Sequence, residues 1–554
     1  MGRRRKTARS RRGRPKAASL HPVEREAAPP ETASRAGLRR FAFPLILAVS
    51  AAAQVATMAM HRIHWNSDQA IVALMARHIQ TGQAHPIFYY GSHYAGTLES
   101  HYLAAVFTLF GSSFASYRLG MMLLLLLHSV LVYAVARRAF GVTAGLAAAA
   151  YLAIPPYFYL YKGLTSDGAY TSLAVLGAGM LYAAVRLEDA QSSGAKRASL
   201  GWAALLGVLA GLAWWVLPLA GYFYVAILLW FLAVARSVFR RPGNYLVFLA
   251  AVLLGSLPWW LGNLGQGWPS FTAPGISLIR SDRVFLGLAD FFRRGVPALF
   301  GAHPAPVHPD IFPGASIVAA LICVLPLGFS LHVLLSPKRR RKEPARRALL
   351  LAVLMFFSIP LVAGLNEETY LFDPRYVYPI YAPFALLLGY ASTRGPLGRR
   401  ALLGLAAGAL VFNTVSILRA PRVPVSFAQP SGAALDRVID ALRERGFREA
   451  YASYWMAYSL AFQSREEIAV ASFGTGTHGT ARWPGYLARV AGSDNPAFVL
   501  WGEEAAKLET YLKRRGARAK TAEVEGYRIF WDVPAEVRRE LAALRYVPDA
   551  AGAP

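Results

Sequence analysis

Carboxylates in short polar segments are the residues of this sequence best suited to chemistry. An acid near the depth of a bilayer is costly to keep there, and such acids are often functional. Asp68 follows the first apolar stretch, within HWNSDQA. Its carboxylate could accept a proton from a reacting group; alternatively, Ser67 or Asp68 could cap the helix that we expect to begin there. The remaining acids in comparable segments are Glu99, Asp167, Asp282, Asp290, Asp310, Glu367, Glu368 and Asp373.

Apolar stretches long enough to cross a bilayer separate these acids. The chain of 554 residues is 55% hydrophobic and only 16% charged, which excludes an ordinary water-soluble enzyme. Its single cysteine, Cys323, excludes a disulfide-stapled scaffold and a thiolate zinc site. About 20 apolar residues span a hydrocarbon core of ~30 Å as a helix. We therefore predict spans over 41–60, 117–136, 141–160, 169–187, 200–217, 218–235, 244–264, 312–335, 346–364, 376–393 and 401–418.

The net charge of +28 follows this predicted topology and does not indicate nucleic-acid binding. Lysine and arginine gather in alternate segments between the spans, for example at Arg137 and Arg138 and in the run KRRRK at 338–342. Positively charged loops stay on the cytoplasmic side of a membrane. The pattern predicts a cytoplasmic N-terminus and, after an odd number of spans, a C-terminus outside the cytoplasm.

Three parts with different compositions follow one another along the chain. Residues 1–40 are basic and rich in Ala and Pro, which predicts a disordered cytoplasmic tail. Residues 41–418 contain the predicted spans and a first external loop at 61–116. Residues 419–554 alternate helix and strand patterns. The predicted fold is a mainly α polytopic membrane protein with about 11 transmembrane helices and a small extracytoplasmic α/β domain at its C-terminus.

Shorter elements are predicted within the external loop and the C-terminal part. The loop contains two amphipathic, surface-lying helices, DQAIVALMARHIQTG and LESHYLAAVFTLFG. In the C-terminal part, LDRVIDALRERG reads as a helix that ends at Gly446. The expected strands are REAYAS, EIAVAS, AFVLW and YRIFW, and the aromatic cluster YASYWMAYSLAF is expected to pack in the core or to stack on sugars.

A series of longer stretches occurs in a recognisable order. SDQAIVALMARHIQTGQAHPIFYYGSHYAGTLESHYLAAVFTLFG precedes RLGMMLLLLLHSVLVYAVARRAFG, GLAWWVLPLAGYF and, late in the chain, DPRYVYPIYAPFALLLGYAS. Together they resemble the GT-C superfamily of membrane glycosyltransferases. The resemblance is to its family 39-like bacterial members, which are related to protein O-mannosyltransferases and to the lipid A aminoarabinose transferase. It covers roughly residues 41–420.

The resemblance implies transfer of a sugar from a polyprenyl-phosphate carrier to an acceptor outside the bacterial cytoplasmic membrane. Asp68 matches the family's acid in the first external loop, which is the catalytic base or orients the acceptor. Asp167, in TSDGAY, matches a second acid between the third and fourth spans, and Glu99 matches an acid of bacterial relatives. Arg375, in the Arg-Tyr-x-x-Pro motif that also contains Tyr376, matches a basic residue expected near the donor phosphate.

General chemistry is compatible with that assignment. An inverting transfer needs one carboxylate that takes the acceptor's proton during attack on the anomeric carbon. A departing phosphate needs no general acid, and cations such as Lys162 and Arg375 can stabilise its charge. We group Tyr376 with them as donor-phosphate-binding. Arg375 as a simple interfacial anchor fits its position equally well.

A metal ion and two other functions remain open on sequence grounds. Six histidines fall between residues 61 and 101, where they could hold a divalent ion together with Asp68 or Glu99 or could be interfacial polar residues. A transporter or lipid-linked glycan flippase would also concentrate polar residues near spans, but no internal repeat is evident. An assembly factor would leave the 61–101 segment unexplained. The expected partners are the lipid-linked donor, a cell-envelope glycan, lipid or protein acceptor, and the bilayer.

Overall fold

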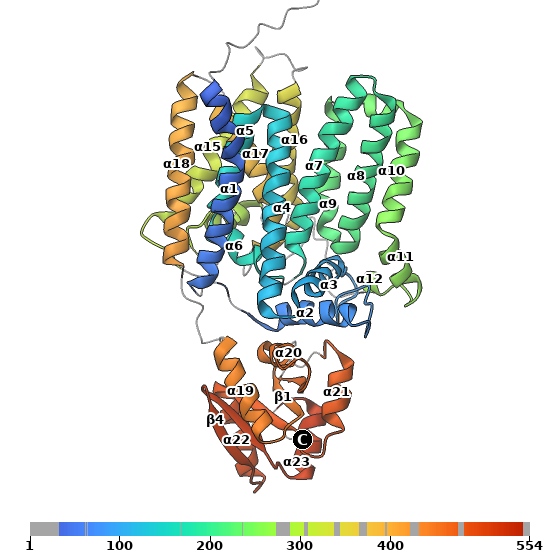
Figure 1. The fold of residues 1–554 in the computed structure, drawn as a ribbon, viewed down its shortest axis with the longest axis vertical. Helices are drawn as coiled ribbons and strands as arrows, with labels where there is room; N and C mark the ends of the chain where they lie inside the picture. Colours follow the sequence, from blue (N-terminus) through green and yellow to red (C-terminus); the bar gives the residue numbers. More distant parts are fainter. Residues whose placement is uncertain are drawn as a thin grey trace, which may run out of the picture.

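A bundle of long helices and an α/β unit lie at opposite ends of the molecule, with two short helices between them (Figure 1). The coordinates are a computed structural model. It describes residues 33–60, 63, 65–166, 168–234, 236–272, 288–303, 309–336, 344–364, 374–393, 396–420, 432–474 and 481–546.

Apolar sequence forms the long helices of the bundle. Their bounds are α1 (Ala33–Ala59), α4 (Phe114–Phe140), α5 (Val142–Ala153), α6 (Tyr157–Gly163), α7 (Tyr170–Ser192), α8 (Lys196–Val216), α9 (Gly221–Val234), α10 (Pro242–Gly255), α11 (Leu257–Leu264), α15 (Ala315–Leu335), α16 (Pro344–Ala363), α17 (Tyr381–Thr393) and α18 (Pro396–Arg419). Short pieces complete it: η1 (Pro218–Ala220), η2 (Arg236–Arg240), α12 (Pro269–Thr272), η4 (Phe291–Gly295), α14 (Val296–Leu299) and η5 (Pro374–Ile380).

Six of the described helices are long and apolar enough to cross a membrane, and eight spans result if each sharply bent pair counts as one. Every stretch predicted as a span contains a helix, so the mainly α class is confirmed. The number eleven stays a prediction, because three of these stretches form shorter helices: Pro218–Val234, Leu403–Arg419 and the 13-residue α17.

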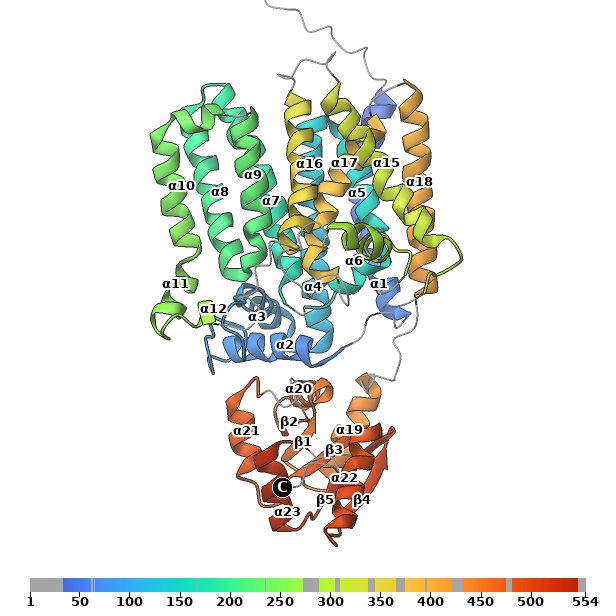
Figure 2. The same ribbon diagram turned by 180° about the vertical axis from the view of Figure 1, so that it is seen from behind.

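Prolines bend two of the helical stretches. α5 and α6 meet at 75° across Pro155 and Pro156, and α10 and α11 meet at 55° just before Pro258. Proline has no backbone N–H to donate and its ring clashes with the preceding turn, so a helix kinks or stops there. The first bend turns α6 steeply away from the direction of α5 (Figure 2).

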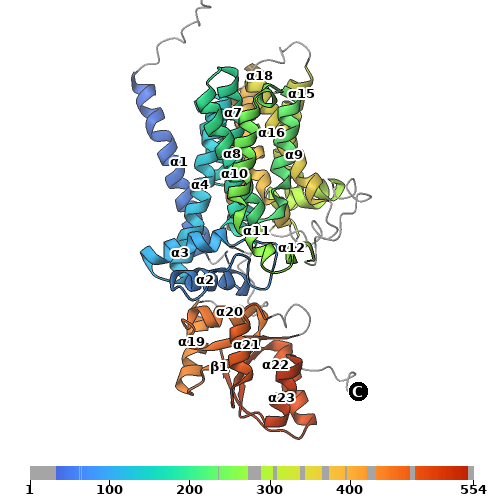
Figure 3. The same ribbon diagram turned by 90° about the vertical axis from the view of Figure 1, so that its right-hand side faces the viewer.

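Helices α2 (Ser67–Gln80) and α3 (Leu98–Phe110) lie across the end of the bundle, between it and the α/β unit (Figure 3). Both were expected as surface helices, and for α2 that expectation is wrong in one respect. Eleven of its residues are buried, because the bundle covers one side and the α/β unit the other. An amphipathic pattern shows which face is most apolar, but not whether a second domain covers the opposite face.

The C-terminal part is a five-stranded mixed sheet in the order β2-β1-β3-β5-β4. Its strands are β1 (Glu449–Ser453), β2 (Ala469–Phe473), β3 (Ala497–Trp501), β4 (Lys520–Val524) and β5 (Tyr527–Trp531). Its helices are α19 (Gly432–Glu444), α20 (Tyr454–Gln463), α21 (Pro484–Ala491), α22 (Gly502–Arg514) and α23 (Ala535–Leu544). β1 pairs in parallel with β2 and with β3. α20 connects β1 to β2, and α21 connects β2 to β3. Four strands match the predicted runs, and β4 was not predicted.

One continuous apolar core joins the two short helices to the α/β unit. Leu74, Phe107 and Tyr117 belong to the same buried cluster as Leu460 of α20 and Val470 of β2. Burying such side chains contributes roughly 1.5–3 kcal/mol each. Helix α20, which contacts α2, α3, β1 and β2, therefore links the sheet to the two short helices.

Candidate active site

Asp68 lies in the first turn of α2, the first helix after α1 in the sequence. Asn66 caps this helix, since its side chain accepts a hydrogen bond from the Gln69 backbone N–H at 3.2 Å. The alternative that Ser67 or Asp68 is the cap is therefore wrong. Ser67 Oγ instead accepts from the Tyr458 backbone N–H at 3.2 Å. The carboxylate of Asp68 is consequently available for contacts outside its own helix.

Two tyrosines from distant segments contact Asp68. Tyr454 Oη, at the start of α20, donates to Asp68 Oδ1 at 2.6 Å, and Tyr89 Oη donates to the Asp68 carbonyl oxygen at 2.8 Å. Arg482 Nε in turn donates to Tyr454 Oη at 3.1 Å. Burial, followed by the charge of Asp68, raises the pKa of both tyrosines, so each hydroxyl keeps its proton and acts as a donor.

Glu99 is almost fully buried in the first turn of α3. Ser166 Oγ donates to its Oε1, and Ser172 Oγ donates to its Oε2 at 2.5 Å. Ser166 belongs to the loop between α6 and α7, and Ser172 to the first turn of α7. A buried carboxylate is tolerated only when hydrogen bonds satisfy it, and here those bonds fix the position of that loop.

The three residues grouped as phosphate ligands lie on α6 and η5. Lys162 is buried near the end of α6, with its ammonium nitrogen 5.2 Å from the centroid of the Tyr161 ring. Arg375 and Tyr376 begin η5, and Arg375 Nη2 donates to Tyr376 Oη at 3.4 Å. The Tyr376 ring packs edge-on against Tyr170, at the start of α7, with 5.8 Å between centroids.

The segment from Lys162 to Ser172 links these groups. It carries Lys162 itself, both serines that bind Glu99, and the tyrosine that packs against Tyr376. It also reaches the start of α2, because Arg118 of α4 donates both to the Leu164 carbonyl and to the Gln69 side chain, which is next to Asp68. Asp167 lies in this segment but outside the described residues. His61 and His64, which precede α2 in the sequence, also lie outside them. Lys162 thus lies on this segment and Glu99 against it, while Asp68 and Arg375 adjoin it through their neighbours Gln69 and Tyr376.

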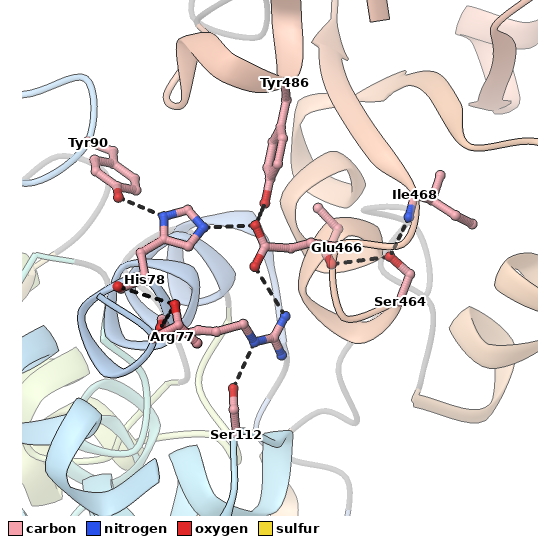
Figure 4. Close-up of polar contacts among 10 residues, drawn as sticks. Arg77, His78, Tyr90, Ser112, Ser464, Glu466, Ile468 and Tyr486 are labelled. Atoms are coloured by element: carbon pink, nitrogen blue, oxygen red, sulfur yellow. Dashed lines mark hydrogen bonds and ion pairs between the residues drawn. The ribbon is translucent and has the colours of Figure 1, made fainter. Parts of the chain in front are cut away.

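A second polar cluster joins the C-terminal end of α2 to the α/β unit (Figure 4). His78 Nε2 donates to Glu466 Oε1 at 2.8 Å, and Tyr486 Oη donates to the same oxygen at 2.6 Å. Tyr90 Oη contacts His78 Nδ1 at 2.7 Å, and Arg77 Nη1 lies 3.8 Å from Glu466 Oε2. Burial alone would raise the pKa of Glu466, but the hydrogen bonds from His78 and Tyr486 and the charge of Arg77 lower it overall.

A metal-binding cluster is not apparent in the part of the chain that the structure describes, where no three His, Cys, Asp or Glu side chains come together. His78 contacts Tyr90 and Glu466, and His101 Nδ1 contacts the Thr97 carbonyl oxygen at 2.9 Å. Both side chains therefore make polar contacts within the protein.

Sequence reasoning did not find the residues of the α/β unit that contact α2. Tyr454 was noted only as part of an aromatic cluster, and Arg482 and Glu466 were not singled out. A sequence signal exists for Tyr454 alone, because it directly follows a strand, at the edge where ligands and active-site groups of parallel sheets collect. Its partner Asp68 lies 386 residues away and can be identified only from the fold.

Comparison with known proteins finds a family match over part of the chain and a shared fold along most of it. Residues 98–261 match the family described as dolichyl-phosphate-mannose-protein mannosyltransferase. No curated protein matches the chain by sequence.

Two solved proteins share the fold along most of the chain. ArnT from Cupriavidus metallidurans, in the structure bound to undecaprenyl phosphate, is 15% identical with a TM-score of 0.62, covering 91% of this chain and 99% of its own. The apo structure of the same protein is 14% identical with a TM-score of 0.61, covering 94% of this chain and 100% of its own. An oligosaccharyltransferase of Archaeoglobus fulgidus, in complex with Zn and sulfate, is 13% identical with a TM-score of 0.51, covering 88% and 72%. The family match thus covers residues 98–261, and the fold of this multi-pass membrane protein is similar to that of ArnT and of the oligosaccharyltransferase.

Proposed function

We propose that the protein transfers a sugar from a polyprenyl-phosphate-linked donor to an acceptor outside the bacterial cytoplasmic membrane. The observation that carries the proposal is the gathering of Asp68, Glu99, Lys162 and Arg375 around one segment at one end of the bundle. The shared fold with ArnT, which has been solved with undecaprenyl phosphate, supports a lipid-phosphate donor. The acceptor class is a cell-envelope glycan, lipid or protein.

Asp68 is the proposed base. Its carboxylate takes the proton of the acceptor's nucleophile as that atom attacks the anomeric carbon of the donor sugar. The bond between the anomeric carbon and the phosphate oxygen breaks, and the electron pair leaves with polyprenyl phosphate. The configuration at the anomeric carbon inverts in this single displacement.

Arg375, Lys162 and Tyr376 are the proposed ligands of the donor phosphate. A guanidinium and an ammonium stabilise the charge that develops on the leaving oxygen, and a tyrosine hydroxyl donates a further hydrogen bond. Cation stabilisation is sufficient because a phosphate is a weak base. The buried position of Lys162 strengthens this interaction, since charges interact more strongly away from water.

Glu99 and Asp167 act on the same segment in this proposal. Glu99 holds the loop between α6 and α7 through Ser166 and Ser172, and Asp167 follows Ser166 directly. We assign Glu99 the role of positioning that loop. Asp167 is the proposed second carboxylate that orients the acceptor.

The orientation in the membrane follows from charge. α1 begins, and α4 ends with Arg137 and Arg138, at the end of the bundle opposite the α/β unit (Figure 1). Positively charged segments favour the cytoplasmic side. The tail of residues 1–40 is then cytoplasmic, and the α2–α3 segment and the domain of residues 419–554 lie outside.

A transfer assay tests the proposal. Membranes containing the wild-type protein are supplied with a panel of polyprenyl-phosphate sugars and cell-envelope acceptors, next to membranes containing Asp68→Asn. We expect transfer from one donor class by the wild type and a loss of about 10²–10⁴-fold in the variant, the range for removal of a general base. Full activity of Asp68→Asn would refute the base assignment, and no transfer from any donor by the wild type would refute the proposed activity.

A further inference from the structure

Helix α20 lies alongside α2 and contacts it near both ends. At its start, Tyr454 donates to Asp68 and the Tyr458 backbone N–H donates to Ser67. Near its end, the centroid of the Phe462 ring lies 4.2 Å from the guanidinium carbon (Cζ) of Arg77. Glu466, three residues beyond the helix, binds His78. The two helices therefore run in the same direction and are joined at two separate points.

The turn that carries Glu466 has an unusual backbone. Arg465 and Glu466 have φ values of 55° and 64°, in the left-handed region that disfavours non-glycine residues. Such conformations persist where the surrounding structure holds them in place. Here the turn directs the Glu466 carboxylate at His78 and Arg77, and its hydrogen bonds to His78 and Tyr486 supply the restraint.

At the other end of α20, hydrogen bonds fix the Tyr454 hydroxyl. Arg482 Nε donates to Tyr454 Oη, while Nη1 of the same guanidinium donates to the Gly91 carbonyl oxygen at 3.2 Å. The Arg482 backbone N–H donates to Tyr458 Oη at 2.6 Å. The Tyr454 hydroxyl is polarised because its oxygen accepts a hydrogen bond from the Arg482 cation. This polarisation strengthens the hydrogen bond that the hydroxyl donates to Asp68. Tyr454 thus holds Oδ1 of Asp68 in a fixed position.

We propose that the C-terminal α/β domain positions the catalytic carboxylate: Glu466 anchors the domain on α2, and Tyr454 then fixes the rotamer of Asp68. The inference rests on the proposed function, because it assumes that Asp68 is the base. In it, Tyr454 and Glu466 are positioning residues. Neither exchanges a proton with the acceptor. A base held in one orientation reacts faster than a freely rotating one, because the reactive geometry is already set.

A single introduced cysteine can report whether the domain is docked. The sequence contains one cysteine, Cys323, and it is buried. Ser67 has no exposed surface and contacts α20, so a cysteine there reacts with a water-soluble maleimide only when the domain lifts off α2. Ser67→Cys in the full-length protein is the labelling background, and the protein with Cys323 alone gives the blank. Activities are measured in the protein with native Ser67.

Three variants separate docking from positioning. Glu466→Ala is expected to raise the labelling rate and to lower kcat, each about tenfold, as for the loss of a charged hydrogen bond. Tyr454→Phe is expected to lower kcat by a similar factor without a change in labelling or in the donor KM. Glu467→Ala is the matched control, since its carboxylate binds Arg443 within the domain at 2.9 Å and should change neither quantity. Glu466→Gln keeps an acceptor oxygen for His78 and Tyr486, so its labelling rate and its kcat should both lie between those of Glu466→Ala and the wild type.

The outcomes distinguish this inference from the proposed function. An active wild type with fully active Tyr454→Phe would overturn the inference alone. Faster labelling of Glu466→Ala at unchanged kcat would overturn it too, because docking would then have no effect on Asp68. A wild type without transfer activity would refute the proposed function, and the inference would fall with it. Lower kcat in Tyr454→Phe and Glu466→Ala, with faster labelling in the latter only, supports the inference.

Discussion

Ser172 Oγ donates to Glu99 Oε2 at 2.5 Å and thereby ties the start of α7 to α3 across 73 residues of sequence. Ser166 makes the second bond to the same carboxylate. Glu99 therefore joins α3 to the loop between α6 and α7, in which Ser166 directly precedes Asp167. The geometry of that loop depends on one buried acid.

Glu99→Ala should accordingly reduce both stability and activity. It leaves two buried hydroxyls without their acceptor, and each unsatisfied group costs about 1–3 kcal/mol. We expect a lower thermal unfolding midpoint in detergent and at least tenfold slower transfer. Glu523→Ala, an exposed acid on β4, is the control and should behave as the wild type. Unchanged transfer by a folded Glu99→Ala protein would contradict the positioning role.

Arg375 should act chiefly on the donor. Arg375→Ala is expected to raise the donor KM and lower kcat, together by about 10–100-fold in kcat/KM, because a charge-assisted contact to phosphate is lost. Arg375→Lys keeps the charge without the planar fork and should be intermediate. Arg294 is a suitable control, since its guanidinium faces Asp290 at 3.7 Å on η4. If Arg375 is only an interfacial anchor, steady-state kinetics will show no change in the donor KM.

Docking of the α/β domain should weaken in acid. The pKa of Glu466 is lower in the docked structure than the ordinary value of 4.5, because the hydrogen bonds from His78 and Tyr486 outweigh the effect of burial. A carboxyl with a lowered pKa contributes stability above its ordinary pKa, and this contribution is lost as the pH falls through the docked value. The protection factors of residues 67–80 in hydrogen exchange, which correct for the intrinsic rate at each pH, should therefore fall as the pH is lowered from 6 to 3. Glu466→Gln should lose that additional pH dependence; if it keeps it, another group is responsible.

Glu504 should have the opposite effect. Burial at the start of α22 raises the pKa of this acid to about 7, against a weaker opposing contribution from a hydrogen bond with Ser453. The folded state then holds a proton that the unfolded chain has already released above pH 4.5, so this group reduces stability as the pH rises toward 7. Glu504→Gln is expected to unfold at a higher temperature than the wild type at pH 8, with little difference at pH 4. Equal midpoints at pH 8 would show that the carboxyl is not destabilised there.

The sequence allowed prediction of the helical stretches and four of the five strands, because local composition determines both. Apolar runs of about 20 residues can bury their backbone only as helices in a membrane, and AFVLW and YRIFW consist mainly of residues that favour strands. β4 was missed because KTAEV is an exposed edge strand with few such residues. Its pairing comes from the tight turn at Glu525 and Gly526, which joins it to β5.

Prediction of the candidate site was less complete, for a physical reason. Asp68, Glu99 and Arg375 could be named because charged residues are rare in apolar sequence and because their positions match those that the family resemblance implies. Their partners Ser166, Ser172 and Tyr454 are ordinary polar residues whose importance comes only from tertiary contacts. The alternative helix cap, Ser67 or Asp68, was placed one or two residues too late for a similar reason. Asn66, Ser67 and Asp68 all suit that position, and only backbone geometry selects Asn66.

Packing between α8 and α10 should influence the site indirectly. A Cβ atom added at Gly211 of α8 would lie 2.2 Å from the Val252 carbonyl oxygen of α10, so the two helices can approach this closely only with glycine there. The end of α8 also holds the segment that carries Tyr89, because Trp215 Nε1 donates to the Ile87 carbonyl oxygen at 3.0 Å. Displacement of α8 should therefore move Tyr89 away from Asp68.

Gly211→Ala is expected to destabilise the protein by about 1–3 kcal/mol, the usual cost of overpacking, and to slow transfer. Gly201→Ala, on the same helix, is the control, because an added Cβ there meets nothing within 4 Å. Alanine is the better helix former by up to ~1 kcal/mol, so the control should be neutral or slightly stabilising. Thermal unfolding in detergent, together with the transfer rate, measures both effects. If Gly211→Ala lowers the midpoint but leaves the transfer rate of the folded fraction unchanged, then α8 does not help to position Tyr89 against Asp68.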